Sequence, residues 1–140
     1  MNERFQNPTL EQIKLILQKV KTIAVVGLSP KENRPSHQVA QHMQSFGYRI
    51  IPIRPAVDEV LGEKAFASLK EVVETIDMVD VFRAPDKISP VIDACIEKNV
   101  PYIWLQDGVV NEDEALRAQT AGIKVIMDRC VYRDYKLLFK

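Results

Sequence analysis

The sequence lacks the features that mark several large classes of protein. Its longest apolar runs have only the length of a β-strand, far short of a membrane span. Neither sign of charge is in excess, because 19 Lys and Arg residues balance 19 Asp and Glu residues, so no overall field favours nucleic acid or an acidic membrane. The first eight residues have no apolar signal core. We therefore expect a cytoplasmic protein that binds neither nucleic acid nor membranes.

Groupings of catalytic or metal-binding residues are also scarce. Cys95 and Cys130 are the only cysteines, too few for a disulfide framework or a metal cluster. His37 and His42 are five residues apart, unlike the i, i+4 pair of a helical metal site. His37 is either near the ligand at the helix N-terminus or, as is favoured, a solvated or capping histidine. Arg129 would lower the pKa of a reactive Cys130 thiol, but without a C-x-x-C partner a structural thiol is favoured. The sequence predicts a binding site and no assignable catalysis.

What the sequence does contain is an unbroken alternation of apolar, strand-like segments and amphipathic, helix-like segments. The expected strands are 22–26, 49–53, 64–66, 78–82, 102–105 and 123–127. The expected helices cover about 9–20, 35–46, 68–76, 89–96 and 111–121. Short connections in this order predict an α/β fold: a Rossmann-like, doubly wound, mainly parallel sheet with helices on both faces. We expect one domain over residues 1–140, with its core at about 22–130.

The first expected strand stops at Gly27 and leads through a polar, proline-containing loop to a helix. This order presents backbone N–H groups and a helix N-terminus to a phosphate. The dinucleotide motif G-x-G-x-x-G is absent, so the ligand has to be inferred from other residues. Gly27 allows close approach of a ligand and the Ser29 hydroxyl can donate to a phosphate oxygen, although Gly27 also suits a simple tight turn. Ser36 is expected to cap the helix that starts at Pro35.

Ligands of doubly wound sheets bind at the carboxyl ends of the strands, so the residues after the other strands are the next candidates. Arg54 follows the second strand, at a position where an NAD site has an acidic residue. A cation at this position suits a ribose that carries a phosphate, as in NADP or coenzyme A. The alternative is that Arg54 is a solvated loop arginine. Phe82 is either a wall for an adenine or the last core residue of its strand. Arg83 either binds phosphate or pairs with Asp80 or Asp86.

Of the residues that follow the fifth expected strand, one is a candidate for the ligand site and one is expected to have a structural role. Gln106 is a candidate for ligand contact, and Gly108 is expected to serve the turn. Trp104, just before them, is expected to be a core residue and not a platform for a ligand.

Several blocks of sequence, taken together and in this order, resemble one known family. The blocks are Ala24–Pro30, Arg34–Ser36, Gly47–Pro55, Leu61–Gly62, Val79–Arg83, Trp104–Asn111 and Asp128–Cys130. The chain resembles the small bacterial CoA-binding proteins, which are single Rossmann-like domains similar to the N-terminal CoA-binding domain of the succinyl-CoA synthetase α subunit. The resemblance spans roughly residues 22–130.

The resemblance implies positions for the ligand, coenzyme A or an acyl-CoA. It places the phosphates near Gly27, Leu28, Ser29, Pro30 and Arg34. The adenosine end would lie near Arg54, Pro55, Phe82 and Arg83.

The chain departs from the family pattern in two places. It has Ile53-Arg54-Pro55 where the family usually has Val-Asn-Pro. It also lacks the acidic-His pair that the family tends to place soon after the Asp128-Arg-Cys130 block. The synthetase's phosphohistidine and nucleotide-grasp parts belong to other domains, and this chain has no room for them.

The leading hypothesis is a protein that binds CoA without catalysis of its own. An NADP-dependent oxidoreductase is the first alternative: Arg54 favours it, but the missing glycines and the absence of a Tyr-Lys or similar proton-donor pair argue against it. The second is an interaction module without a ligand. The amphipathic N-terminal helix and the 132–139 tail would suit a sheet edge, a homodimer contact or a partner enzyme.

Overall fold

A computed structural model describes residues 4–140, and its centre is a five-stranded sheet with the strand order β2-β1-β5-β6-β7. Every neighbouring pair is parallel. The strands are β1 (Thr22–Val26), β2 (Arg49–Ile53), β5 (Met78–Val81), β6 (Tyr102–Leu105) and β7 (Lys124–Met127). Their positions match five of the expected strands to within one residue at either end. The predicted doubly wound α/β fold is confirmed.

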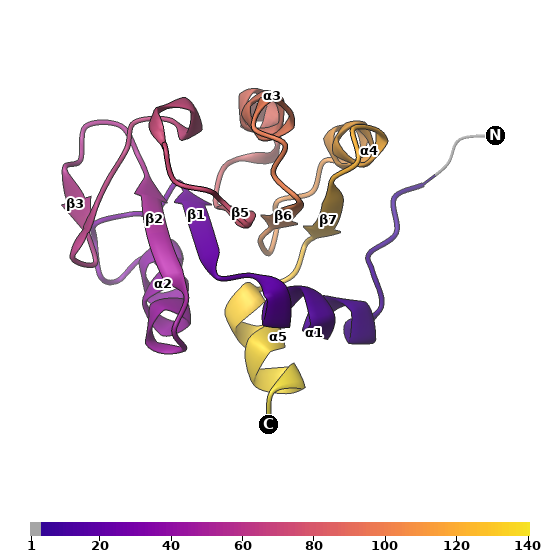
Figure 1. Ribbon diagram of the computed structural model, residues 1–140, viewed down its shortest axis with the longest axis horizontal. Helices are drawn as coiled ribbons and strands as arrows, with labels where there is room; N and C mark the ends of the chain where they lie inside the picture. The colour runs from indigo at the N-terminus through magenta and orange to yellow at the C-terminus, as the bar shows by residue number, and fades with distance from the viewer. Residues whose placement is uncertain (1–3) are drawn as a thin grey trace.

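Helices cover both faces of this sheet (Figure 1). One face carries α1 (Leu10–Lys19), α2 (Pro35–Ser45) and α5 (Val131–Leu138). The other carries α3 (Ser89–Glu97) and α4 (Glu112–Thr120). No helix within residues 4–140 has the length and apolarity needed to cross a membrane.

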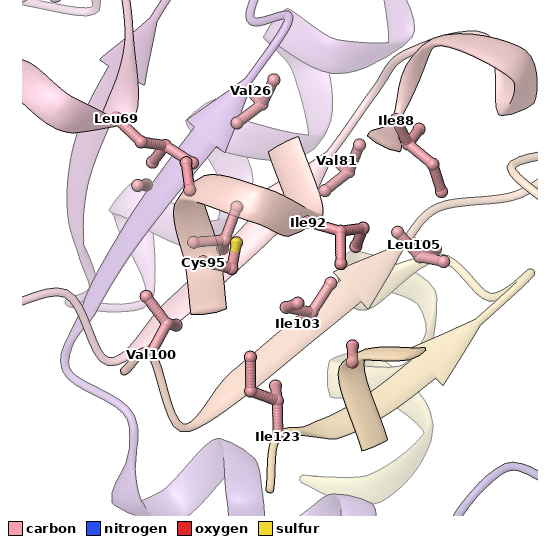
Figure 2. Close-up of a cluster of buried hydrophobic side chains, with 14 of the residues drawn as sticks. Val26, Leu69, Val81, Ile88, Ile92, Cys95, Val100, Ile103, Leu105 and Ile123 are labelled. Atoms are coloured by element: carbon pink, nitrogen blue, oxygen red, sulfur yellow. The ribbon is translucent and has the colours of Figure 1, made fainter. Parts of the chain in front are cut away.

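The apolar strands read as continuous runs because successive side chains enter two different cores. In β1, Ile23 and Val25 belong to the core under α1 and α2, whereas Ala24 and Val26 belong to the core on the α3 side of the sheet. Figure 2 shows the second core, in which Ile92 and Cys95 of α3 lie over Ile103 of β6. Burial raises the pKa of the Cys95 thiol to about 12, so this cysteine stays a neutral core residue.

The predicted capping residues at the starts of α1 and α4 are confirmed. Thr9 and Gln12 form a complete capping box before α1, each side chain bonding the other's backbone N–H. Asn111 caps α4 by accepting from the N–H of Glu114. The 132–139 tail belongs to α5, which packs against α1 and α2 and stacks Tyr135 between Phe46 and Phe139.

Two predictions between β2 and β5 are wrong. The expected helix at 68–76 is only a 3₁₀ turn, η1 (Leu69–Glu71), after which the chain runs on without a helix. Its Ser68–Glu71 capping box is present, but the β-branched residues that follow are poor helix formers. The expected strand at 64–66 is shifted: β3 (Glu59–Val60) and β4 (Glu63–Lys64) form a small hairpin, and Phe66 makes one isolated bridge to Ile53.

The strand order fixes where a ligand site belongs. Counted along the main sheet alone the order is 2-1-3-4-5, so the chain leaves β1 toward one edge and later returns to the other side of β1 as β5. The crevice at the carboxyl ends of β1 and β5 is therefore the switch point of the sheet, the usual ligand position in this architecture. Gly27 directly follows β1, and Phe82 directly follows β5.

Candidate functional site

Gly27 marks the closest approach between the ends of β1 and β5. Its φ is +83°, and a Cβ built on it would lie 2.2 Å from the carbonyl oxygen of Phe82. The neighbouring Phe82 N–H donates to the Val26 carbonyl at 2.9 Å, which holds the two strand ends together. Only glycine fits this position, for both steric and conformational reasons. The tight-turn interpretation of Gly27 is thus correct, and the residue also lines the cavity described below.

The loop from Gly27 to Pro35 is held in shape by its own helix. The Ser29 N–H donates to Ser36 Oγ at 3.0 Å, and the Lys31 N–H donates to Ser29 Oγ at 3.1 Å. His37 Nδ1 lies 2.9 Å from the Ser29 carbonyl oxygen. Ser29, Ser36 and His37 are all buried. The loop conformation is therefore fixed before any ligand arrives.

Two of the predictions for this helix need correction. Ser36 does not cap α2: the N-cap is Arg34, and Ser36 lies inside the first turn with its hydroxyl turned back to Ser29. His37, expected to be solvated or capping, is instead buried against the loop backbone. Within residues 4–140 no side chain caps α2, so the first-turn N–H groups of this helix have no side-chain partner.

Two cavities adjoin at the switch point. The first, about 850 Å³, lies between the Gly27 loop and the end of β6. The second, about 720 Å³, lies between the end of β2, η1 and the start of α3. Four residues line both cavities and so form the boundary between them: Gly27, Arg54, Phe82 and Arg83.

Most of the predicted site residues lie around this boundary. The first cavity also takes Ser29, Pro30, Arg34 and Ser36, and the second takes Pro55. Leu28 differs, because its side chain is fully buried in the core under α2, which leaves only its backbone for a ligand. Phe82 is half-buried: its ring packs on the core and still lines both cavities, so the two interpretations of this residue are compatible.

The arginines divide into two groups. Of the eight in the sequence, five form salt bridges: Arg4, Arg49, Arg117, Arg129 and Arg133. The other three are Arg34, Arg54 and Arg83, and within residues 4–140 none of them has a salt bridge or a side-chain hydrogen bond. All three line the first cavity. Arg83 does not form the alternative ion pair with Asp80 or Asp86 within the described chain.

Lysines also line the cavities, and the sequence reasoning missed them. Lys31 adds positive charge to the first cavity. Lys70 and Lys87 line the second, where Lys70 pairs with Glu97 at 4.0 Å and where Asp93 and Glu97 are also part of the wall. Their positions follow from the loop after β1 and from the segments before and after β5, so only the folded chain brings them together. The arrangement suits a ligand with several phosphate groups.

The far end of the first cavity is built by the segment after β6. The Gly108 N–H donates to Asp128 Oδ1 at 2.8 Å, and Arg133 makes two 2.8 Å bonds to the carboxylate of Asp107. Arg133 thereby holds the pKa of Asp107 below its ordinary value. Cys130 is a free thiol on the wall of this cavity, and Trp104 lies in the core as expected, its Nε1 donating to the Arg129 carbonyl.

Asp80 and Gln106 form a buried polar pair under this part of the cavity. Gln106 Nε2 donates to Asp80 Oδ1 at 2.5 Å, and the two residues are 3% and 1% exposed. Burial raises the pKa of Asp80 to about 7, although the bonds from Gln106 and from the backbone of Val81 act in the opposite direction. The sequence analysis did not predict this pair; the one signal for it in the sequence is an acid, Asp80, between two valines of an apolar strand.

Fold and cavity together define a doubly wound α/β protein with its crevice at the switch point of a parallel sheet. Comparison with known proteins narrows this class. Residues 21–136 match the family model described as CoA binding domain, and the chain belongs to that family.

Three relatives illustrate the range of the similarity. YneT of Bacillus subtilis strain 168, itself uncharacterized, is 47% identical over 126 residues, which cover 90% of this chain and 93% of YneT. A hypothetical protein from Pyrococcus horikoshii OT3 has a solved structure with a TM-score of 0.92 at 31% identity, covering 100% of both chains. An ADP-forming acetate–CoA ligase of Methanocaldococcus jannaschii is 31% identical over 81 residues, which are 57% of this chain but only 11% of the ligase.

Proposed function

We propose that this protein binds coenzyme A or an acyl-CoA across the boundary of the two cavities, without catalysis of its own. Family membership supports the ligand class, and the similarity to part of an acetate–CoA ligase agrees with it. The proposed contacts are those predicted from the sequence: Gly27, Leu28 through its backbone, Ser29, Pro30, Arg34, Ser36, Arg54, Pro55, Phe82 and Arg83.

One observation carries the proposal. The three arginines without an acidic partner in the described chain are the three that line the first cavity, and two of them also line the second. CoA brings a pyrophosphate and a ribose phosphate, which guanidinium groups bind through charge-assisted hydrogen bonds. The first-turn N–H groups of α2 add a favourable dipole for the pyrophosphate.

The two cavities suit the two ends of such a molecule. The adenosine would occupy the second cavity, where Pro55, Leu69 and Val91 provide apolar walls and Phe82 closes one side. The pyrophosphate would lie at the boundary formed by Gly27, and the arm beyond it would extend along the first cavity toward the end of β6.

Isothermal titration calorimetry with CoA tests this assignment. We expect Arg54→Ala and Arg83→Ala each to weaken binding by about 1–3 kcal/mol, the usual value of a hydrogen bond to a charged group. Arg49→Ala is the matched control, because it removes the same side chain from the first residue of β2, where Arg49 pairs with Glu63 and Glu74 and none of the three lines either cavity. Titration curves for both cavity variants that overlay the wild type would contradict the proposal.

NADP is the second candidate ligand, and a single observation favours it. Arg54 stands at the end of β2 without an acidic partner in residues 4–140, where a 2′-phosphate would bind. NADP in place of CoA in the same calorimeter decides between them. Tight binding of NADP with no heat from CoA would replace the first proposal with the second.

A further inference from the structure

The amide of Gln106 has one occupied end and one free end. Its Nε2 donates to Asp80 Oδ1, but its Oε1 accepts no hydrogen bond from any described donor in residues 4–140. In the same part of the chain, every fully covered side-chain nitrogen or oxygen has a partner. The free Oε1 therefore retains access to open space, and the space that Gln106 lines is the first cavity.

Asp80 determines which end of this amide faces the cavity. An ionised carboxylate only accepts hydrogen bonds, so it requires the amide nitrogen of Gln106 on its side. A reversed amide would set Oε1 against the carboxylate, and because both residues are buried the repulsion between the two oxygens would be poorly screened. The other end of the amide, Oε1, is therefore an acceptor on the cavity side of a residue that is only 3% exposed.

We propose, on the basis of the CoA-binding function above, that Gln106 Oε1 accepts a hydrogen bond from an amide N–H on the ligand arm beyond the pyrophosphate. Asp80 acts as the positioning residue, since it touches Gln106 and not the ligand. The site would thus select nucleotides whose arm contains a secondary amide, as the pantetheine arm of CoA does. Arg54 and Arg83 recognise phosphate alone, so this contact would distinguish CoA from other phosphorylated nucleotides.

Protonation of Asp80 would release the amide from this single orientation. A neutral Asp80 has an O–H donor beside its carbonyl acceptor; when the O–H bonds Oε1, the Nε2 donors turn toward the cavity and the acceptor is lost. The other buried titratable groups on this face of the sheet have their own partners. His37 on α2 bonds the Ser29 carbonyl, and Asp134 on α5 pairs with Arg129 at 2.6 Å. Cys130 precedes α5, and no charged side chain contributes to the pKa of Asp80.

The test compares CoA with two synthetic analogues in which an ester oxygen replaces one or the other amide N–H of the arm. All three ligands carry the same phosphates, so phosphate titration cancels in their affinity ratios. At pH 8.5 we expect one analogue to bind about tenfold more weakly than CoA, the loss of one hydrogen bond. At pH 5.5 we expect this ratio to approach one.

Two variants test whether Gln106 and Asp80 cause the difference in affinity between CoA and the weaker-binding analogue. In Asp80→Asn the ratio of the two affinities should lose its pH dependence, because the neutral side chain at position 80 does not titrate. In Gln106→Met it should be close to one at every pH, because the acceptor is gone. The wild-type pH series stands on its own should either variant fail to fold. Equal binding of CoA and both analogues at pH 8.5 would overturn this inference and leave CoA binding intact, whereas no heat from CoA itself would overturn the proposed function.

Discussion

Gly27 connects the stability of the sheet with the geometry of the cavity. A Cβ at this position meets the Phe82 carbonyl at 2.2 Å, in addition to the cost of a positive φ. We expect Gly27→Ala to lower the free energy of unfolding by at least about 2 kcal/mol, measured by urea denaturation. Gly47→Ala is the control, because Gly47 also has a positive φ but no atom within 4 Å of its added Cβ. Equal losses in the two variants would show that the Phe82 contact is unimportant.

Asp80 should give the protein an unusual dependence of stability on pH. Its pKa is raised from 3.8 to about 7 on folding, so between these values the folded state holds a proton that the unfolded state has released. Raising the pH through this window therefore favours unfolding, by an amount on the order of 4 kcal/mol for three pK units, and stability levels off above pH 7.

The measurement is urea denaturation from pH 4 to 8 for the wild type and Asp80→Asn. The difference in unfolding free energy between the two should move steadily in favour of the variant as the pH rises. A comparison is needed because Glu74 and Asp107 have lowered pKa values, which make their contributions fall as the pH drops toward the acid range. A constant difference would contradict the assignment of the proton to Asp80.

Helix α2 supports the loop from Gly27 to Pro35 through a hydrogen bond that the sequence pattern did not reveal. Ser36 accepts from the buried Ser29 N–H, which would have no partner without that hydroxyl. Ser36→Ala should lower the unfolding free energy by about 1–3 kcal/mol and weaken CoA binding, since the loop would no longer be preformed. Ser45→Ala on the same helix removes an exposed hydroxyl that bonds only the His42 carbonyl and should have little effect on either quantity.

The elements predictable from the sequence are those determined by local patterns. Continuous apolar runs located β1 and β2, and the capping residues Thr9 and Asn111 located the starts of α1 and α4. The same reasoning failed at Ser68, where a genuine capping box opens only a 3₁₀ turn. There the buried positions of the following segment pack without a helix, and packing outweighed the local signal.

Those residues of the candidate site that directly follow a strand were predictable from the sequence. Arg54 and Arg83 were found because parallel strands gather their carboxyl ends at one edge of the sheet. Their lack of acidic partners, and the pairing of Asp80 with Gln106, depend on side-chain positions across different strands. No spacing rule along one chain encodes such contacts.

For the molecule as a whole, ligand binding should appear as added stability. CoA at one hundred times its dissociation constant would contribute about 2.7 kcal/mol, which corresponds to a rise in Tm of roughly 5–15 °C for a chain of this size. A thermal-shift panel of CoA, acyl-CoAs, NAD, NADP and ATP measures this directly. Stabilisation by CoA or acyl-CoA alone is expected; stabilisation by NADP alone, or by none of the five, would contradict it.

The pairing of β1 with β5 joins residues far apart in the chain, as in the register of Ile23 with Met78. The cavity boundary therefore does not exist until this distant pairing has closed, and parallel pairings of this kind form slowly. A ligand that recognises only the completed boundary cannot bind the unfolded chain or a transition state in which this pairing has not yet formed. We therefore expect CoA to lower the rate of unfolding, and so to lengthen the lifetime of the native state, while the rate of refolding stays the same.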